Sequence, residues 1–174
     1  MPTPSDETEA VAVAEFAVKP PRSVARLAAV QALYQMEMGG ADANRVIAEF
    51  IAVRFDQEIE GISYPPVDRS WFALLVRGVV GRQDEIDDLI AATVSQDWSL
   101  PRIDATLRAI IRAATFELLC RPDVPLKVII SEYVDVAHAF FSGSEPGFAN
   151  SVLDRLARAA RPEFFTTGDR PKKS

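Results

Sequence analysis

The sequence predicts an all-α protein of about six to seven helices joined by short connectors. Apolar residues recur at the spacing of three and four that places them on one face of a helix, in segment after segment. Glycine, proline or a capping aspartate stands at most boundaries between these segments. No segment shows the sustained alternation of apolar and polar residues that is typical of a half-buried strand.

Composition and charge restrict the class of protein. A chain of 174 residues, 48% hydrophobic and 25% charged, suits one globular domain or two small ones that share a core. The net charge is −6 and the pI is about 4.9. A protein that binds nucleic acid alone is usually basic, so this balance favours binding through a local patch or with a basic partner.

Cysteine content and the lack of a targeting signal bear on the compartment. One cysteine, Cys120, allows no disulfide within the chain. The first 20 residues carry acids and lack the basic start of a secretory signal. No apolar run approaches the roughly 18 residues that a membrane span needs. We therefore expect a soluble, cytoplasmic protein.

The N-terminal part predicts a tail followed by a helix. Residues 1–21 hold four prolines and several acids, and we expect them to form a disordered acidic tail. A helix is predicted over 22–38 and ends at Gly39-Gly40. Arg22 and Arg26 stand four residues apart and should share one face of it. Cations in a first turn oppose the helix dipole, so the pair either binds an outside anion or forms a solvated polar face.

The next two patterns complete the first half of the chain. Asp42 or Asn44 can cap a helix that reaches about residue 56. Asp68 then caps a long helical pattern that ends at Trp98, and glycines at 78 and 81 predict close helix contacts or a kink within it. Trp71 and Trp98 fall in apolar stripes and are predicted to be core residues.

Three more helices are predicted in the second half. The first covers about 102–120, where Asp104 and Arg108 can pair. The second, 125–141, is apolar on most sides and is expected at the centre of a bundle. A turn-rich loop over 142–147 leads to a last helix from Phe148 to about Ala160, and residues 166–174 are expected to form a flexible tail.

The chain offers little for catalysis. Its only histidine, His138, and its only cysteine lie in strongly helical segments, with nothing to align them as a nucleophile and base. One histidine cannot complete a di-iron or zinc set, and no phosphate-binding loop is present. We therefore predict no enzyme activity, no metal and no cofactor. Binding surface remains: the arginine pair and the 142–148 loop, where Phe148 can stack on a base or pack in the core.

Several blocks resemble one family in its own order. They are residues 22–37, 97–103, 109–118, 124–132 and 148–154. Together they resemble the bacterial NusB transcription antitermination family over about residues 22–156. The resemblance implies two packed three-helix-type bundles, about 22–97 and 98–165, forming one domain over 22–165.

The same resemblance implies a function and its residues. Members are not enzymes: they bind the single-stranded boxA element of ribosomal RNA leader transcripts together with the ribosomal protein NusE, within the RNA polymerase antitermination complex. Sequence-specific binding of unstacked RNA suits such a surface. The positions that carry over are Arg22, Arg26, Ser144 and Phe148 for RNA, and Leu107 and Arg108 for the partner.

The chain departs from the family pattern at these surfaces. Ser23 and Val24 stand where basic residues are frequent, Ser144 replaces a common acid and Gly147 a common lysine, and Leu107 replaces a glutamate. We therefore expect weak RNA affinity without the partner.

Two alternatives keep the fold and change the role. The domain also resembles the RNA-binding part of some ribosomal RNA cytosine methyltransferases, but no methyl-donor domain or catalytic cysteine motif follows it in this sequence. A protein–protein adaptor or homodimer with its arginine face buried in an interface stays open, as does the oligomeric state.

Overall fold

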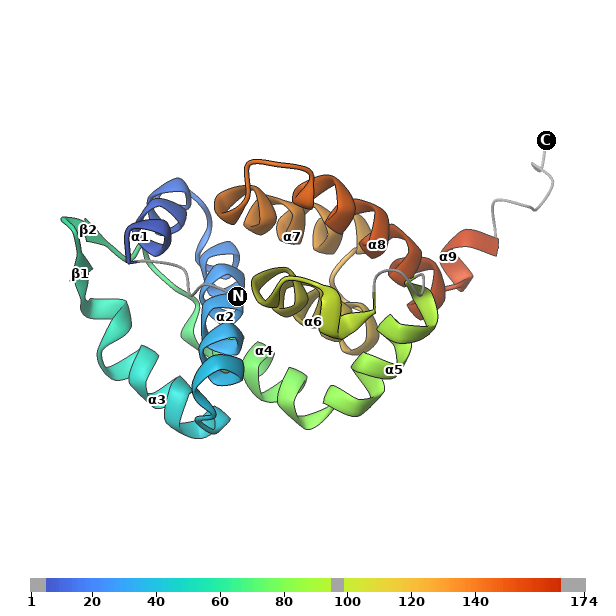
Figure 1. Cartoon of the computed structure of the whole chain (residues 1–174), viewed down its shortest axis with the longest axis horizontal. Helices are drawn as coiled ribbons and strands as arrows, with labels where there is room; N and C mark the ends of the chain where they lie inside the picture. Colours follow the sequence, from blue (N-terminus) through green and yellow to red (C-terminus); the bar gives the residue numbers. More distant parts are fainter. Residues whose placement is uncertain (1–5, 95–98, 167–174) are drawn as a thin grey trace.

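The computed structural model describes residues 6–94 and 99–166 and confirms the all-α class (Figure 1). Trp98 lies outside these residues, so its predicted burial stays untested. The elements are α1 (Asp6–Glu15), α2 (Pro21–Gly39), α3 (Ala43–Ala52), β1 (Glu58–Ile59), β2 (Ile62–Ser63), α4 (Arg69–Gly81), α5 (Gln83–Thr93), α6 (Ala105–Cys120), α7 (Leu126–Phe140), α8 (Glu145–Ala160) and α9 (Glu163–Thr166).

Helices α2 and α6 form the centre of the molecule. Every residue of α2 from Ser23 to Tyr34 is buried, and α6 packs against α2, α4, α5, α7 and α8 (Figure 1). The expectation that 125–141 is the central helix is wrong. Helix α7 buries one face, which includes Ile129, Tyr133 and Val136, while Val128 on its outer side is 42% exposed. The apolar residues on other sides of α7 are half-buried at the edges of this face, because the four helices that contact α7 leave its outer side exposed.

The two halves share one core. Helix α2 packs on α3 and α4 and also on α6 and α7, so its buried residues belong to both bundles. Helix α5 packs mainly on α6 and α8. By these contacts the second bundle begins with α5 rather than near residue 97.

The long pattern after Asp68 forms two helices instead of one kinked helix. Asp68 caps α4 as predicted, accepting a hydrogen bond from the backbone N–H of Trp71. Gly78 makes the close contact that its position predicts, since a Cβ there would lie 2.2 Å from the ring of Phe116. Beside Gly81 there is no such neighbour, and the chain turns at Arg82 before α5 begins.

The acidic N-terminal segment corrects another expectation. Residues 6–15 form α1, which packs against α7 and β2 (Figure 1). Ala12, Val13 and Phe16 are buried there, and Glu9 pairs with Arg54 at 3.1 Å. The prediction of a disordered tail is therefore wrong for this segment, because its apolar side chains pack against α7 and β2, which are distant in the sequence. Residues 1–5 and 167–174 lie outside the described part.

A two-residue hairpin joins α3 to α4 and was not predicted. Glu58 pairs with Ser63 and Ile59 with Ile62 in an antiparallel register. Glu60 and Gly61 form the turn with positive φ angles of 51° and 79°. Strands this short leave no alternating pattern in a sequence, so periodicity could not find them.

Candidate nucleic-acid interface

The two arginines at the start of α2 have different environments. The side chain of Arg22 is 46% exposed, whereas Arg26 is 3% exposed. The expectation that they form one exposed pair is therefore corrected. Residues four apart diverge slightly around a helix, and here the difference puts Arg26 against α6 and α7. Of this pair, Arg22 is the arginine that can reach an outside anion in this conformation.

Arg26 lies in a buried ionic network that joins α2, α6 and α7. Its guanidinium donates to both carboxylate oxygens of Glu117 at 2.8 and 2.9 Å and to Glu132 at 2.9 Å. Ser23 also donates to Glu132, at 2.5 Å, and the Tyr133 hydroxyl donates to Glu117 at 2.6 Å. Burial alone would lower the pKa of Arg26, but the hydrogen bond and charge of Glu117 outweigh it and raise that pKa. The network thus fixes the start of α2.

The guanidinium carbon of Arg26 is also 5.9 Å from the ring centroid of Trp71, and two other guanidinium groups lie closer to the same indole ring. The guanidinium carbon of Arg22 is 3.8 Å from the ring centroid of Trp71, and that of Arg121 is 4.7 Å from it. We call these three residues the arginine–tryptophan stack. Trp71 is 4% exposed, which agrees with its predicted core position. A guanidinium that contacts an aromatic face can still donate its N–H groups at its edge, so this surface can bind anions such as phosphate.

Each arginine of the stack has a carboxylate beside it. Arg121 donates to both oxygens of Asp123, at 2.8 and 3.0 Å, and Arg22 lies 3.9 Å from Asp68. The hydrogen bond from Arg121 is the main cause that lowers the pKa of Asp123, and the charge of Arg22 adds to it. Asp123 is exposed, and exposed ion pairs are weak and screened by salt. A phosphate can therefore replace Asp123 beside Arg121, whereas Asp68 is half-buried and also accepts from the backbone N–H of Trp71.

Hydrogen bonds from Arg161 hold the connector between α6 and α7, which carries Arg121. The buried guanidinium of Arg161 donates to the backbone carbonyls of Glu117, Leu118, Arg121 and Val124, at 2.7–3.1 Å. Carbonyls in the last turn of a helix, such as that of Leu118, lack a donor within the helix. The carbonyls of Glu117 and Arg121 also accept from the backbone N–H groups of Arg121 and Val124, so Arg161 adds a second bond to each. Burial lowers the pKa of Arg161. The main chain at Arg121 is thus held in one conformation.

The second predicted group of residues lies at the other end of α6. Ser144 and Phe148 come together with Leu107 around a pocket of about 510 Å³, which Ile103 also lines. Ser144 is exposed, Phe148 is half-buried and packs on the core, and Leu107 is buried. Leu107 lies in the first turn of α6, whereas the arginine network binds Glu117 near its end. The predicted residues therefore form two clusters separated by most of the length of α6.

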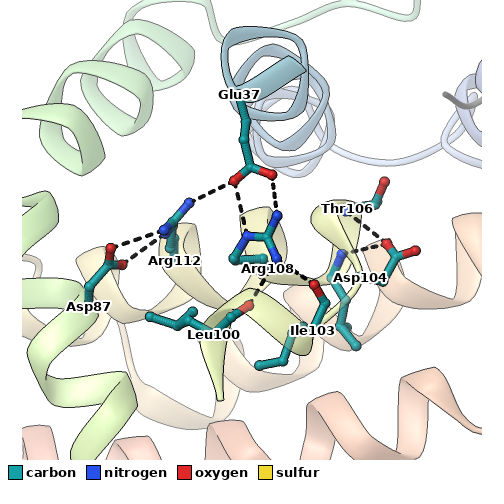
Figure 2. A network of polar contacts seen from close by, with 9 residues as sticks. Glu37, Asp87, Leu100, Ile103, Asp104, Thr106, Arg108 and Arg112 are labelled. Atoms are coloured by element: carbon teal, nitrogen blue, oxygen red, sulfur yellow. Dashed lines mark hydrogen bonds and ion pairs between the residues drawn. The ribbon is translucent and has the colours of Figure 1, made fainter. Parts of the chain in front are cut away.

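Arg108 does not pair with Asp104 as its spacing predicts. Figure 2 shows that its guanidinium donates to Glu37 of α2 and to the backbone carbonyls of Leu100 and Ile103. Asp104 instead caps α6 and accepts from the backbone N–H of Thr106 at 2.8 Å. Asp104 does not pair with Arg108, four residues later, because its carboxylate accepts from the backbone N–H groups of the first turn of α6.

Glu37 is the shared acceptor in this second network. Besides Arg108 it accepts from Arg112 at 3.1 Å, and Arg112 also binds both oxygens of Asp87 (Figure 2). The hydrogen bond from Arg108 is the main cause that lowers the pKa of Glu37. Arg108 and Arg112 therefore tie α2, α5 and the chain before α6 together, and Arg108 acts mainly by positioning the pocket that contains Leu107.

The described residues contain no group of three or more histidine, cysteine or acidic side chains arranged to hold a metal ion. Burial raises the pKa of Cys120, which disfavours a reactive thiolate. Cys120 ends α6, whereas His138 lies in the last turn of α7, the end that packs near the start of α6. In the same part of the chain, no helix has both the length and the apolar content to cross a membrane.

Comparison with known proteins identifies close relatives. Residues 23–158 match the NusB family. Transcription antitermination protein NusB of Rhizobium rhizogenes is 53% identical over 142 residues, which cover 82% of this chain and 89% of that protein. The protein of the same name from Allorhizobium ampelinum is 55% identical over 140 residues, 80% of this chain and 88% of that protein.

Solved NusB structures have a similar fold. T. maritima NusB superimposes with a TM-score of 0.69 at 30% identity, covering 86% of this chain and 99% of that chain. A crystal structure of antitermination factors NusB and NusE in complex with dsRNA gives a TM-score of 0.66 at 20% identity, over 79% of this chain and 96% of that chain. That last likeness establishes the shared fold.

Proposed function

The chain belongs to the NusB family, and we propose that it is a transcription antitermination factor that binds boxA RNA of ribosomal leader transcripts together with NusE. The observation that carries this proposal is 53% identity to a NusB antitermination protein over 82% of the chain. In this role the protein binds RNA and a partner and performs no catalysis, and it acts in the cytoplasm, where transcripts are made.

The geometry supports an RNA-contacting role for Arg22. Its guanidinium is exposed, is held on Trp71 and lies at the start of a fixed helix. Because the whole chain is acidic, with a net charge of −6, one such cluster supplies little of the charge that RNA requires. A basic ribosomal protein bound beside it would supply the rest. We assign Arg26 a positioning role, since its guanidinium is already committed to Glu117 and Glu132.

The pocket at the start of α6 is our proposed second contact region. Ser144 at its rim can reach RNA, and Phe148 offers a partly exposed aromatic ring. Leu107 makes the lining apolar where the family commonly has a glutamate, which suits an apolar side chain of the partner. Arg108 holds the adjoining main chain through Leu100 and Ile103 and so shapes this surface.

A binding titration tests the proposal. Labelled boxA RNA is titrated with the full chain, with and without NusE, at two salt concentrations. NusE should raise the affinity by well over the tenfold that about 1.4 kcal/mol represents. Arg22→Ala should weaken binding and flatten its salt dependence, because each lost phosphate contact on a single strand lowers the slope by about 0.7.

The matched control is Arg45→Ala. Arg45 is exposed on α3, which follows the C-terminal end of α2, so it lies at the opposite end of that helix from Arg22. It should bind like the wild type. Equal affinity with and without NusE would contradict the cooperative mechanism. No RNA binding under any condition would reject the RNA-binding function in favour of an adaptor or homodimer.

A further inference from the structure

We infer that Arg121 is a second RNA-contacting residue, which acts with Arg22 across the ring of Trp71 to grip the phosphodiester backbone of a single strand. The inference rests on the RNA-binding function proposed above and adds a residue that neither the sequence pattern nor the family likeness assigns. Arg121 comes 99 positions after Arg22 in the sequence, and only the fold places the two against one ring.

The geometry of the stack suits phosphate. Both guanidinium carbons lie within 5 Å of one ring centroid, at 3.8 and 4.7 Å, so the two cations are close neighbours. Their side chains are 46% and 32% exposed, while the ring itself is covered. A guanidinium that lies flat on an aromatic face directs its donors sideways, where a phosphate can accept two of them. Two such groups can engage neighbouring phosphates of one strand.

Like charges this close need a reason to stay together. Each has a carboxylate within reach, Asp68 for Arg22 and Asp123 for Arg121, and the ring face attracts both cations. The two acids keep the cluster neutral when no anion is bound. Because Asp123 is exposed, it is a weak competitor that a phosphate can displace. The affinity for RNA therefore depends on how readily a phosphate displaces the carboxylate from its arginine.

The main chain on both sides of the stack is fixed before binding. Arg161 binds the carbonyls of Arg121 and Val124 at 2.7 Å, which holds the connector. One turn after Arg22, the buried pair between Arg26 and Glu117 holds α2. Binding therefore needs to order only the ends of two side chains, which reduces its entropic penalty. This preorganisation distinguishes Arg121 from exposed arginines on free helix faces.

The test uses the full chain with NusE and labelled boxA RNA, and it measures affinity over a range of salt concentrations. Arg121→Ala should lower the affinity several-fold and flatten the salt slope by about 0.7, as Arg22→Ala does, and the double variant should flatten it by about twice that. Arg121→Lys should keep the salt slope and lose part of the affinity, because it retains the charge without the planar fork. Asp123→Asn should bind more tightly than wild type.

Controls separate this inference from the proposed function. Arg45→Ala should match wild type, and thermal unfolding of each variant should show that the fold is retained. If Arg22→Ala weakens binding while Arg121→Ala behaves like Arg45→Ala, the inference is wrong and the RNA-binding function stands. If Arg121→Ala weakens binding with an unchanged salt slope, Arg121 acts through structure and the inference is again wrong. If wild type with NusE does not bind RNA, the function itself fails.

Discussion

Arg26 of α2 and Glu117 of α6 form a bidentate ion pair in the protein interior, with both side chains almost completely buried. The pair joins residues that are 91 positions apart and ties the start of the first central helix to the end of the second. It separates two arginines of one sequence motif into different roles. Arg26 holds the helix, and Arg22, one turn earlier, stays exposed.

Removing one partner of this pair should lower the free energy of unfolding more than replacing both partners with apolar residues. Arg26→Met should lower the free energy of unfolding by about 3–5 kcal/mol, because it leaves a buried carboxylate without its cation. The double variant Arg26→Met/Glu117→Leu should lose less than either single variant, since no isolated charge remains. Urea denaturation measures all three. Additive losses in the double variant would show that the pair does not interact in this way.

Acid should weaken the network around Glu37. Its pKa in the folded protein is lowered from an ordinary value of 4.5, mainly by the hydrogen bond from Arg108. The unfolded chain therefore takes up the proton more readily. The stabilisation is fully present above that ordinary value and is lost as the pH falls through the folded pKa.

Glu37→Gln measures this contribution. The free energies of unfolding of wild type and variant should differ at about pH 7 and converge as the pH falls below the ordinary pKa of glutamate. Asp42→Asn is a control, because that carboxylate caps α3 by accepting from the backbone N–H of Arg45 and forms no ion pair among the contacts the structure shows. A Glu37→Gln difference that stays constant with pH would contradict the assignment.

Gly78 and Gly81 should respond oppositely to a methyl group. A Cβ at Gly78 would meet the ring of Phe116 at 2.2 Å, and Phe116 is itself buried in α6. Gly78→Ala should therefore cost about 1–3 kcal/mol through overpacking. Gly81→Ala meets nothing within 4 Å and should be neutral or gain up to about 1 kcal/mol from helix propensity. Thermal unfolding of the two variants compares them directly; equal destabilisation would contradict the packing explanation.

Local signals in the sequence predicted most helices, and distant contacts decided the rest. Asp42 and Asp68 cap α3 and α4 as predicted, because capping involves only neighbouring residues. The burial of Arg26 depends on Glu117, which no local pattern connects to it. Residue spacing alone predicts that Arg22 and Arg26 are equivalent.

The same limit applies to the rest of the site. Arg121 stands in a short connector before a proline and carries no sign of function in the sequence. Its position against Trp71 follows from the packing of α4 beside α6. Pro146 lies in the first turn of α8, which starts at Glu145 rather than at Phe148 as expected, because proline is tolerated there.

Helix α1 should contribute to stability although it precedes residues 23–158, the part that matches the family. Phe16 is 2% exposed in the turn after α1, whereas Val18, two residues on, is 94% exposed. Phe16→Ala should cost about 3 kcal/mol or more, since it leaves a cavity among buried neighbours. Val18→Ala should change the free energy of unfolding by less than about 0.5 kcal/mol. If both variants unfold like wild type in urea, α1 does not dock on α7 and β2 in solution, and the expectation of a disordered tail would be restored.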